Sequence, residues 1–392
     1  MSRTDRAPVL FVAGESSGDR HLAGLIREAR KLDRTLRFEG VGGRHAAESG
    51  ARILHDAHEL SVVGIAEVLE RLPALRRVMA DLKRRLRQRR PSALLLVDFP
   101  DFNLHLAHTA ARAGIPVVYF ISPQVWAWRQ RRVAVIRRRV TRMIVLFPFE
   151  AAFYEQHGVR VTYVGHPLAE ALADRVPADE ARRRLGLEGR SHVFGLLPGS
   201  RRGEVRRHVG PMLEVARLVL EREPRAAFVV PIAEGLEPDE IERPLMASGL
   251  PIVAQRDLFA LLIDACDAAL VASGTATLEV ALRGVPTVVV YKMARTTHRL
   301  VRWVVRVPHV SLINLIAERA LVPELIQDAF TPPRAADQLL ALGRPGEPRE
   351  RFFSGLEDVR GRLGEPGAYR RAAEAVLDVL DEAAAVRGES RA

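Results

Sequence analysis

The feature that most constrains the fold is a strand–turn–helix pattern that occurs in both halves of the chain. The apolar run VLFVAG leads into the turn GESSGD and the helical pattern HLAGLIREARKL. In the second half, HVFGLLPG leads into SRRGEVRRH and PMLEVARLVLERE. Strands that are apolar throughout and alternate with helices predict parallel sheets covered on both faces.

A second pair of segments repeats the pattern. ALLLVDFPDFN precedes LHLAHTAARAG and IPVVYF, and AALVASGTAT precedes LEVALRG and VPTVVVY. We predict an α/β fold with two Rossmann-like, doubly wound lobes that face each other across a cleft, residues 1–165 and 166–365. We expect the last amphipathic helix, about residues 366–392, to cross back onto the first lobe. Ligands of such sheets bind beyond the carboxyl ends of the strands, where all four turns lie.

The composition narrows the class of protein. Cys266 is the only cysteine, which excludes an intramolecular disulfide framework and a CxxC metal site. No signal peptide is visible, because MSRTDRAP leads directly into the first strand. No apolar run reaches the roughly 20 residues needed to span a bilayer, and Asp264 and Asp267 interrupt the longest candidate. We expect a cytoplasmic protein.

Positive charge points to anionic partners. The formal net charge is +11, and arginine is dense in residues 76–90 and 129–142. Such stretches favour phosphates, acidic lipid surfaces or nucleic acid, or they are solvated helix faces. No nucleic-acid-binding motif is recognisable and only 6% of the residues are aromatic, so we expect no nucleic-acid partner.

The turn SGTATLE, residues 273–279, is a candidate diphosphate site, because it follows a strand and opens a helix. Gly274 lets a ligand approach closely. The hydroxyls of Ser273, Thr275 and Thr277 can donate to phosphate oxygens, and Glu279 can accept ribose hydroxyls. The alternative is a capping box with Thr275 or Ala276 near the cap and Glu279 reaching back to it.

The turn LPGSRRGE, residues 197–204, occupies the equivalent place at another strand end of the same lobe. Gly199 and Ser200 precede Arg201, whose guanidinium can neutralise the charge that develops on a leaving diphosphate. The alternative is a surface turn before a helix.

The first lobe presents carboxylates. In VDFPDFN, Asp98 stands at the strand end, where a carboxylate can take a proton from an attacking hydroxyl. Asp101 is equally interpretable as a helix N-cap. GESSGD resembles an anion-binding turn but is neither GxGxxG nor a Walker sequence, so neither a dinucleotide nor ATP is indicated. His105 and His108 share a helix, and we expect them to pack or face solvent rather than bind metal.

The stretch 60–86 has apolar residues at helical spacing with arginines between them. Pro73 predicts the start of a second helix there. One interpretation is a helix packed on the sheet. The other is a basic amphipathic surface that docks on an anionic membrane and admits acyl chains.

Taken together, these motifs resemble the lipid-A-disaccharide synthases of Gram-negative bacteria. The resemblance covers nearly the whole chain in order, with AGESSGD, GVGG, ELSVVGIAEVLERLP, VDFPDFNL, ISPQVWAWRQRR, LFPFE, VGHPL, LLPGSRRGEV, ASGTATLEVAL, VSLINLIAE and VPELIQ. Ser16 stands where alanine is common, and Phe99 where a small residue is common. Trp126 and Trp128 of the SPQVWAWR segment are expected to be packing residues.

The resemblance implies a GT-B glycosyltransferase fold that needs no metal or other cofactor. It implies an acceptor-binding first lobe and a second lobe that binds the donor UDP-2,3-diacylglucosamine. The acceptor is 2,3-diacylglucosamine 1-phosphate (lipid X), and the product is a β-1,6-linked disaccharide 1-phosphate formed with inversion. Acylated substrates imply peripheral association with the anionic cytoplasmic face of the inner membrane.

Residue roles also follow from the resemblance. Asp98 is the expected base for the acceptor hydroxyl. On the acceptor or reacting-sugar side we expect Glu15, Ser17, Gly18 and Asp19. On the UDP side we expect Gly199, Ser200, Arg201, Ser273, Gly274, Thr275, Thr277, Glu279 and Asn314. The alternative with the same fold is another UDP-sugar enzyme, either an epimerase or a peptidoglycan-type glycosyltransferase.

Overall fold

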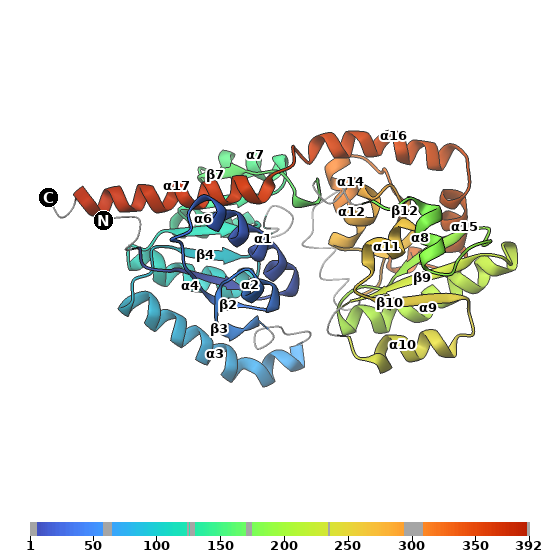
Figure 1. Ribbon diagram of the computed structural model, residues 1–392, viewed down its shortest axis with the longest axis horizontal. Coiled ribbons are helices and arrows are strands. Elements are labelled where there is room, and N and C mark those ends of the chain that lie inside the picture. Colours follow the sequence, from blue (N-terminus) through green and yellow to red (C-terminus); the bar gives the residue numbers. More distant parts are fainter. Residues whose placement is uncertain are drawn as a thin grey trace. The chain divides into compact units, whose positions relative to one another are not determined.

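The computed structural model describes residues 6–57, 65–123, 125, 130–169, 175–233, 236–293 and 309–389. The chain divides into two compact units (Figure 1). Unit 1 comprises Met1–Pro167 and Leu363–Ala392, and unit 2 comprises Leu168–Arg362. Trp126, Trp128 and residues 60–64 of the amphipathic stretch lie outside the described residues.

Unit 1 contains a seven-stranded parallel sheet in the order β3-β2-β1-β4-β5-β6-β7. Its strands are β1 (Val9–Ala13), β2 (Phe38–Gly42), β3 (Arg52–Asp56), β4 (Leu94–Val97), β5 (Val117–Phe120), β6 (Arg142–Val145) and β7 (Val161–Tyr163). Its α-helices are α1 (Ser16–Leu32), α2 (Arg44–Glu48), α3 (Ile65–Gln88), α4 (Pro100–Arg112), α6 (Val133–Arg139), α7 (Pro148–Gln156) and α17 (Ala368–Glu389), and short 3₁₀ turns lie at Gln130–Arg132 and Pro167–Ala169.

Unit 2 contains a six-stranded parallel sheet in the order β10-β9-β8-β11-β12-β13. Its strands are β8 (Val193–Leu197), β9 (Ala227–Ile232), β10 (Ile252–Arg256), β11 (Ala268–Ala272), β12 (Thr287–Tyr291) and β13 (Glu324–Ile326). Its α-helices are α8 (Ala178–Arg184), α9 (Arg202–Arg222), α10 (Pro238–Ala247), α11 (Phe259–Asp264), α12 (Thr275–Leu282), α14 (Leu312–Ala317), α15 (Pro332–Gly343) and α16 (Glu347–Arg362), and a 3₁₀ turn spans Gln327–Ala329.

The two sheets share one winding rule. In each, the first strand in sequence pairs with the fourth, β1 with β4 and β8 with β11, so the chain winds outward to both sides of that pair. The point between these strands is the topological switch point of a doubly wound sheet. Two doubly wound parallel-sheet units confirm the predicted fold class.

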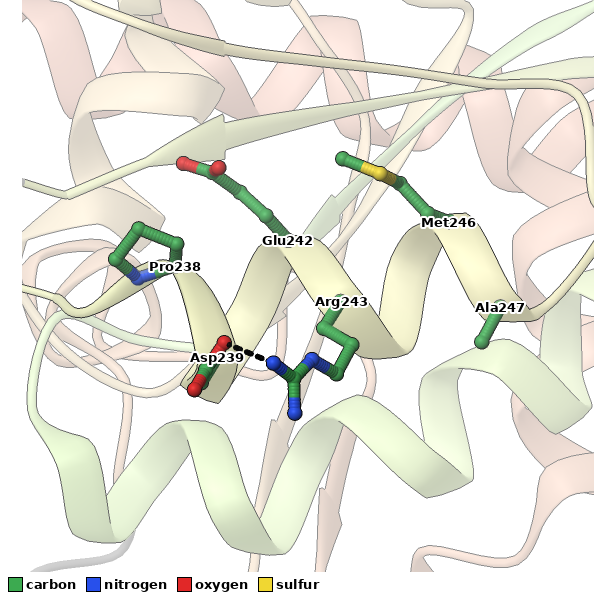
Figure 2. A pocket seen from close by; sticks show the side chains of 6 residues that line it. All are labelled: Pro238, Asp239, Glu242, Arg243, Met246 and Ala247. Carbon is green, nitrogen blue, oxygen red and sulfur yellow. Dashed lines mark ion pairs between the residues drawn. The ribbon is translucent and has the colours of Figure 1, made fainter.

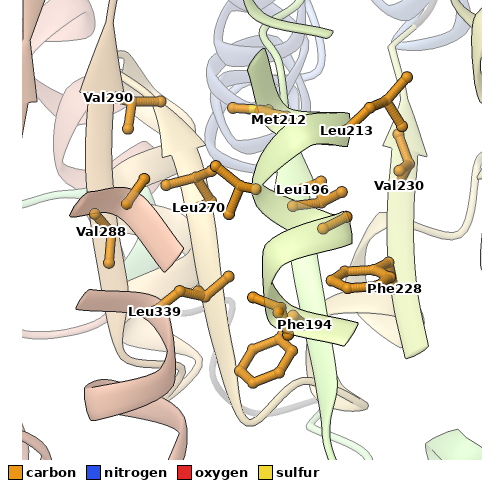
Figure 3. Packing of buried hydrophobic residues seen from close by; sticks show 14 of the residues in the cluster. Phe194, Leu196, Met212, Leu213, Phe228, Val230, Leu270, Val288, Val290 and Leu339 are labelled. Atoms are coloured by element: carbon orange, nitrogen blue, oxygen red, sulfur yellow. The ribbon is translucent and has the colours of Figure 1, made fainter. Parts of the chain in front are cut away.

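The unit 2 core explains why the strands are apolar throughout. On one face of the sheet, Phe194, Phe228 and Leu270 pack against Met212 of α9 and Leu339 of α15 (Figure 3). On the other face, a separate buried cluster joins side chains of the same strands to α8, α11 and α12. Both faces are therefore removed from water, which leaves the strand ends as the places for polar chemistry.

The C-terminal helix α17 packs on α1 within unit 1 (Figure 1, red and dark blue). A Cβ atom at Gly24 of α1 would lie 2.6 Å from the ring of Tyr369 of α17. The Tyr369 hydroxyl lies 3.0 Å from Nδ1 of His21. The close approach requires a residue without a side chain at position 24.

Arg371 of α17 binds both segments through which the chain passes between the units. Its guanidinium donates to the carbonyl oxygens of Val164 at 2.9 Å, Pro366 at 2.7 Å and Glu365 at 2.5 Å. The outgoing and returning segments are therefore held on unit 1 by one side chain.

The amphipathic stretch differs from its prediction in one respect. Pro73 does not start a helix, because α3 runs continuously from Ile65 to Gln88 with Pro73 exposed inside it. Val78, Leu82 and Leu86 of α3 are buried in the unit 1 core. The packing interpretation therefore holds for the apolar positions from 75 to 86, while the side chains of residues 65–71 lie outside the described part. Among the described residues, no helix is long and apolar enough to cross a bilayer.

We predict that Gly24→Ala destabilises the protein by about 1–3 kcal/mol, since the added methyl group overlaps the Tyr369 ring. Gly361→Ala in α16 is the matched control, because no atom lies within 4 Å of its added Cβ. It should be neutral or stabilising by up to ~1 kcal/mol. Urea unfolding of both variants measures the difference, and equal midpoints would contradict the packing of α17 on α1.

Candidate functional site

The predicted turns of unit 1 lie at its switch point. Ala13 of β1 pairs with Val97 of β4, so the turns GESSGD and VDFPDFN leave the sheet from adjacent positions. They also touch, because a Cβ atom at Gly14 would lie 2.7 Å from the ring of Phe99. Phe99 therefore covers the first turn.

Asp98 is partly exposed at the end of β4 and has an unusual backbone. Both Asp98 and Phe99 have a φ of +47°, in the left-handed region that side chains disfavour. The Asp98 carbonyl oxygen accepts hydrogen bonds from the Tyr119 hydroxyl at 2.5 Å and from Nδ2 of Asn103 at 2.7 Å. Strained backbone that is held by buried donors is typical of functional sites.

The N-cap interpretation of Asp101 is wrong. Helix α4 begins at Pro100 with Phe99 at the cap, so Asp101 lies inside the first turn. Its carboxylate is exposed and forms an ion pair with Arg132. Of the two carboxylates in VDFPDFN, Asp98 is the one at the switch point.

The GESSGD turn contains one buried carboxylate. Asp19 is 2% exposed, and it accepts hydrogen bonds from the backbone N–H groups of Gly43 at 2.7 Å, His45 at 3.0 Å and Ala46 at 3.3 Å. It therefore joins the first turn to the VGGRH turn and the start of α2. Gly18 packs against Val97, with an added Cβ at 3.6 Å from that side chain.

The other predicted residues of this turn lie nearer the surface. Glu15 occupies the N-cap position of α1 and Ser17 lies in the first helical turn, and both are partly exposed. The side chain of Ser16 lies outside the described part of the chain.

The predicted turns of unit 2 lie at the second switch point, since Leu197 of β8 pairs with Val271 of β11. Gly199 has a φ of +114°, and a Cβ there would lie 2.5 Å from Oε2 of Glu204. Glu204 accepts hydrogen bonds from the backbone N–H groups of Ser200 at 3.2 Å and Arg201 at 3.4 Å. The side chains of Ser200 and Arg201 remain exposed at the start of α9.

The SGTATLE turn opens α12 with Gly274 at the N-cap. The capping-box alternative is wrong, because the third helical position is Thr277 and not Glu279. Thr277 is fully buried, and its hydroxyl donates to the Gly274 carbonyl at 2.7 Å. Its proton is thus used within the helix, whereas Gly274 and Thr275 are exposed and Ser273 is partly exposed.

We expected Asn314 on the UDP side, but in the structure its side chain forms hydrogen bonds with the chain around β13. Its side chain is 1% exposed. Its Nδ2 donates to the Val322 carbonyl and to Oε1 of Glu324, each at 2.9 Å, and its Oδ1 accepts from the N–H groups of Leu321 and Val322. All the hydrogen-bonding capacity of the amide serves the chain around β13, so it has none to offer a nucleotide.

Sequence reasoning missed His208 of α9, which is fully buried. Its Nε2 accepts from the Lys292 N–H at 2.9 Å, so Nδ1 carries the proton that is donated to the Pro198 carbonyl at 2.9 Å. The neutral ring therefore ties the PGSRR turn to the end of β12. The signal was present, because position 208 shares the helical face of Val205, Val209 and Met212.

Two hollows are lined mainly by helices, and the one on unit 1 borders the VDFPDFN turn through Pro100 and Asp101. One, of about 530 Å³, is lined by α10, including Glu242, Arg243 and Met246 (Figure 2). All six residues that line it belong to that helix, and two of them, Asp239 and Arg243, form an ion pair with each other. The other, of about 150 Å³, is lined by residues of α4 and α6, with Arg132 before α6. Within the described part of the chain, no group of three His, Cys, Asp or Glu is placed to hold a metal ion.

The chain is similar to known proteins over nearly its full length. The profile of the family described as "Lipid-A-disaccharide synthetase" matches residues 9–352. A relative from Geobacter metallireducens named "Lipid-A-disaccharide synthase" is 43% identical over 380 residues, which are 97% of this chain and 99% of the relative. One of the same name from Myxococcus xanthus is 43% identical over 377 residues, 96% and 98% of the two chains.

Solved structures share the fold at low identity. A putative UDP-N-acetylglucosamine 2-epimerase from Listeria monocytogenes has a TM-score of 0.64 at 14% identity, covering 96% of this chain and 97% of its own. The calicheamicin glycosyltransferase CalG4 has a TM-score of 0.59 at 17% identity, covering 96% and 99%. These similarities confirm the predicted GT-B fold.

We predict that His208→Phe lowers the free energy of unfolding by on the order of 2 kcal/mol, since it leaves the Lys292 N–H and the Pro198 carbonyl without their partner. The same substitution at exposed His105 is the control and should change stability little. Urea unfolding at pH 7.5 measures both.

The pH dependence gives the prediction a second readout. Burial lowers the pKa of His208, although the Pro198 carbonyl and Glu204 oppose that shift. Below about pH 6.5 the unfolded chain binds a proton at this histidine that the folded chain does not, so stability falls as the pH falls. His208→Phe should remove part of this decline, and an unchanged slope between pH 7.5 and 5.5 would contradict the buried neutral ring.

Proposed function

Because this chain belongs to the lipid-A-disaccharide synthase family and is a glycosyltransferase, we propose that it condenses UDP-2,3-diacylglucosamine with lipid X and releases UDP. The family resemblance seen in the sequence is confirmed by the profile and the relatives. The observation that carries the proposal is that each switch point holds a pair of turns, which carry the carboxylates Glu15 and Asp98 in unit 1 and Arg201, hydroxyl groups and two helix N-termini in unit 2.

We assign the binding of UDP to unit 2. Helices α9 and α12 begin a few residues after β8 and β11, and the positive ends of their helix dipoles attract a diphosphate. Arg201 is exposed at the start of α9, where its guanidinium lies 3.7 Å from Oε1 of Glu204, and its positive charge can also reach a bound diphosphate. Ser273 and Thr275 are accessible hydroxyl donors, and Glu279 is a partly exposed acceptor for the ribose.

We assign the acceptor and the base to unit 1. The Asp98 carboxylate takes the proton from the acceptor 6-hydroxyl as that oxygen attacks the anomeric carbon of the donor. The bond from that carbon to the diphosphate oxygen breaks, and its electron pair leaves with UDP. One displacement of this kind converts an α-linked donor into a β-1,6-linked product.

The remaining turn residues support these roles. Glu15 and Ser17 are accessible to the reacting sugar, whereas Asp19 and Gly18 shape the turn from within. Thr277 likewise acts from within by closing the first turn of α12.

We further propose that unit 1 docks on anionic membrane through a basic face formed by α3, α4 and α6. Helix α4 packs against both α3 and α6. Exposed arginines on this face are Arg76, Arg77, Arg84, Arg87, Arg112, Arg137 and Arg138. The two carboxylates among the described side chains of these helices, Asp81 and Asp101, already contact arginines. The uncompensated charge suits the inner-leaflet surface that carries both acylated substrates.

We predict that Asp98→Asn lowers kcat for disaccharide formation by at least about 10²-fold while the Kd for UDP changes little. Asp101→Asn is the matched control and should retain most of the turnover, since that carboxylate is exposed and paired with Arg132. The assay follows UDP release and disaccharide from UDP-2,3-diacylglucosamine and lipid X. Absence of both products with the unmodified protein, or epimerisation of the donor, would refute the proposed function.

We predict that the double reversal Arg76→Glu, Arg77→Glu weakens binding to phosphatidylglycerol-containing vesicles by at least about tenfold, because each basic residue near the surface contributes about 1 kcal/mol. Activity on detergent-dispersed substrates should persist. Arg190→Glu with Arg334→Glu, both exposed on unit 2, makes the same change in net charge and is the control. Equal vesicle binding by the two variants would contradict the assigned face.

A further inference from the structure

We propose that Tyr119 is a positioning residue that holds the Asp98 carboxylate in its working place through a hydrogen bond to the Asp98 backbone. This inference rests on the proposed function only in naming Asp98 as the base. The hydrogen bond itself and its structural consequence are independent of the reaction.

Tyr119 lies in β5, the strand next to β4, where its Cα pairs with that of Leu96. The side chain is fully buried. Its hydroxyl donates a hydrogen bond to the carbonyl oxygen of Asp98, the residue that follows β4, at 2.5 Å. Because the acceptor is a main-chain carbonyl, this hydrogen bond holds the backbone of the turn at Asp98.

The turn needs such support, because two successive residues with side chains occupy the left-handed region. Asp98 and Phe99 each have a φ of +47°, a conformation that persists only where surrounding contacts hold it. Nδ2 of Asn103 shares the task, with bonds to the carbonyl oxygens of Asp98 at 2.7 Å and Val97 at 3.2 Å. The Phe99 ring, packed 5.5 Å from that of Phe102, supports the outer side of the turn.

The Tyr119 hydroxyl stays protonated and can therefore always donate this hydrogen bond. Burial raises the pKa of Tyr119 well above its usual value, and the nearby Asp98 carboxylate raises it further. The hydroxyl thus keeps its proton at every working pH. The backbone of the turn sets the direction of the Asp98 Cα–Cβ bond, from which the carboxylate extends, so losing this donor lets the carboxylate shift, and a shift of about 1 Å can cost up to roughly 10²-fold in rate.

The test is Tyr119→Phe, which keeps the buried ring and removes only the donor. Tyr154→Phe is the matched control, since Tyr154 is equally buried and its hydroxyl lies 2.8 Å from Oγ of Ser122. We expect Tyr119→Phe to lower kcat by about tenfold or more with the KM for the donor substrate nearly unchanged. Tyr154→Phe should lower the melting temperature by a similar amount and leave kcat within about twofold.

A double-mutant cycle separates positioning from general destabilisation. In the Asp98→Asn background, Tyr119→Phe should have little further effect on the residual rate, because there is no longer a base to position. An equal fold-loss in both backgrounds would overturn the inference, as would an unchanged kcat for Tyr119→Phe alone.

Hydrogen exchange tests the inference without any activity. The backbone amides of residues 98, 99 and 101–103 should exchange faster in Tyr119→Phe than in the unmodified protein or in Tyr154→Phe. Unchanged exchange there overturns the positioning role whatever reaction the enzyme performs. Faster exchange in a protein that forms no disaccharide would instead refute the proposed function and leave the positioning of Asp98 intact.

Discussion

The pairing of the first strand of each sheet with the fourth is the constraint on which the rest of the structure depends. Because β1 pairs with β4 and β8 with β11, the connections after these strands run to opposite sides of the sheet. Their first residues meet at the carboxyl edge without covering each other. Every turn with candidate chemistry leaves the sheet at one of these two points, while strand interiors are committed to the apolar core.

The two switch points use different electrostatics for different tasks. In unit 2, the starts of α9 and α12 and the exposed Arg201 are the groups we propose for the leaving diphosphate, and Glu204 holds the turn before α9 by accepting the N–H groups of Ser200 and Arg201. In unit 1, the first turn is neutralised from within, because three backbone N–H groups bind the Asp19 carboxylate. Glu15 and Asp98 are the partly exposed carboxylates at this edge, and Asp98 lies on a turn that buried side chains hold in a strained conformation. A diphosphate needs hydrogen-bond donors, which we propose unit 2 supplies. A reacting hydroxyl needs a proton acceptor, which we propose unit 1 supplies.

The fold and the location of the site could be predicted from the sequence, but the direction of several side chains could not. Continuous apolar runs and Gly-Ile-Pro or Gly-Val-Pro stops specify parallel strands and helices, and turns after strands specify the edge. Whether a hydroxyl or amide faces solvent depends on its hydrogen-bond partners in the folded chain, and the local sequence does not identify these partners. The Asn314 amide is hydrogen-bonded to Val322 and Glu324, and the Thr277 hydroxyl to the Gly274 carbonyl.

The start of α4 at Pro100 follows the preference of proline for the first helical position, whereas α3 continues through Pro73 although proline disfavours a helix interior. His208 and Tyr119 were missed because each lies within an apolar pattern and shows its role only through distant backbone groups.

The position of UDP in a crystal of the complex tests the central claim most directly. The account predicts diphosphate oxygens within about 3 Å of backbone N–H groups at the starts of α9 and α12 and of the Arg201 guanidinium. It also predicts that the uridine and ribose lie over unit 2 near Glu279. A nucleotide bound at the turns of unit 1, or in the hollow on α10, would contradict it.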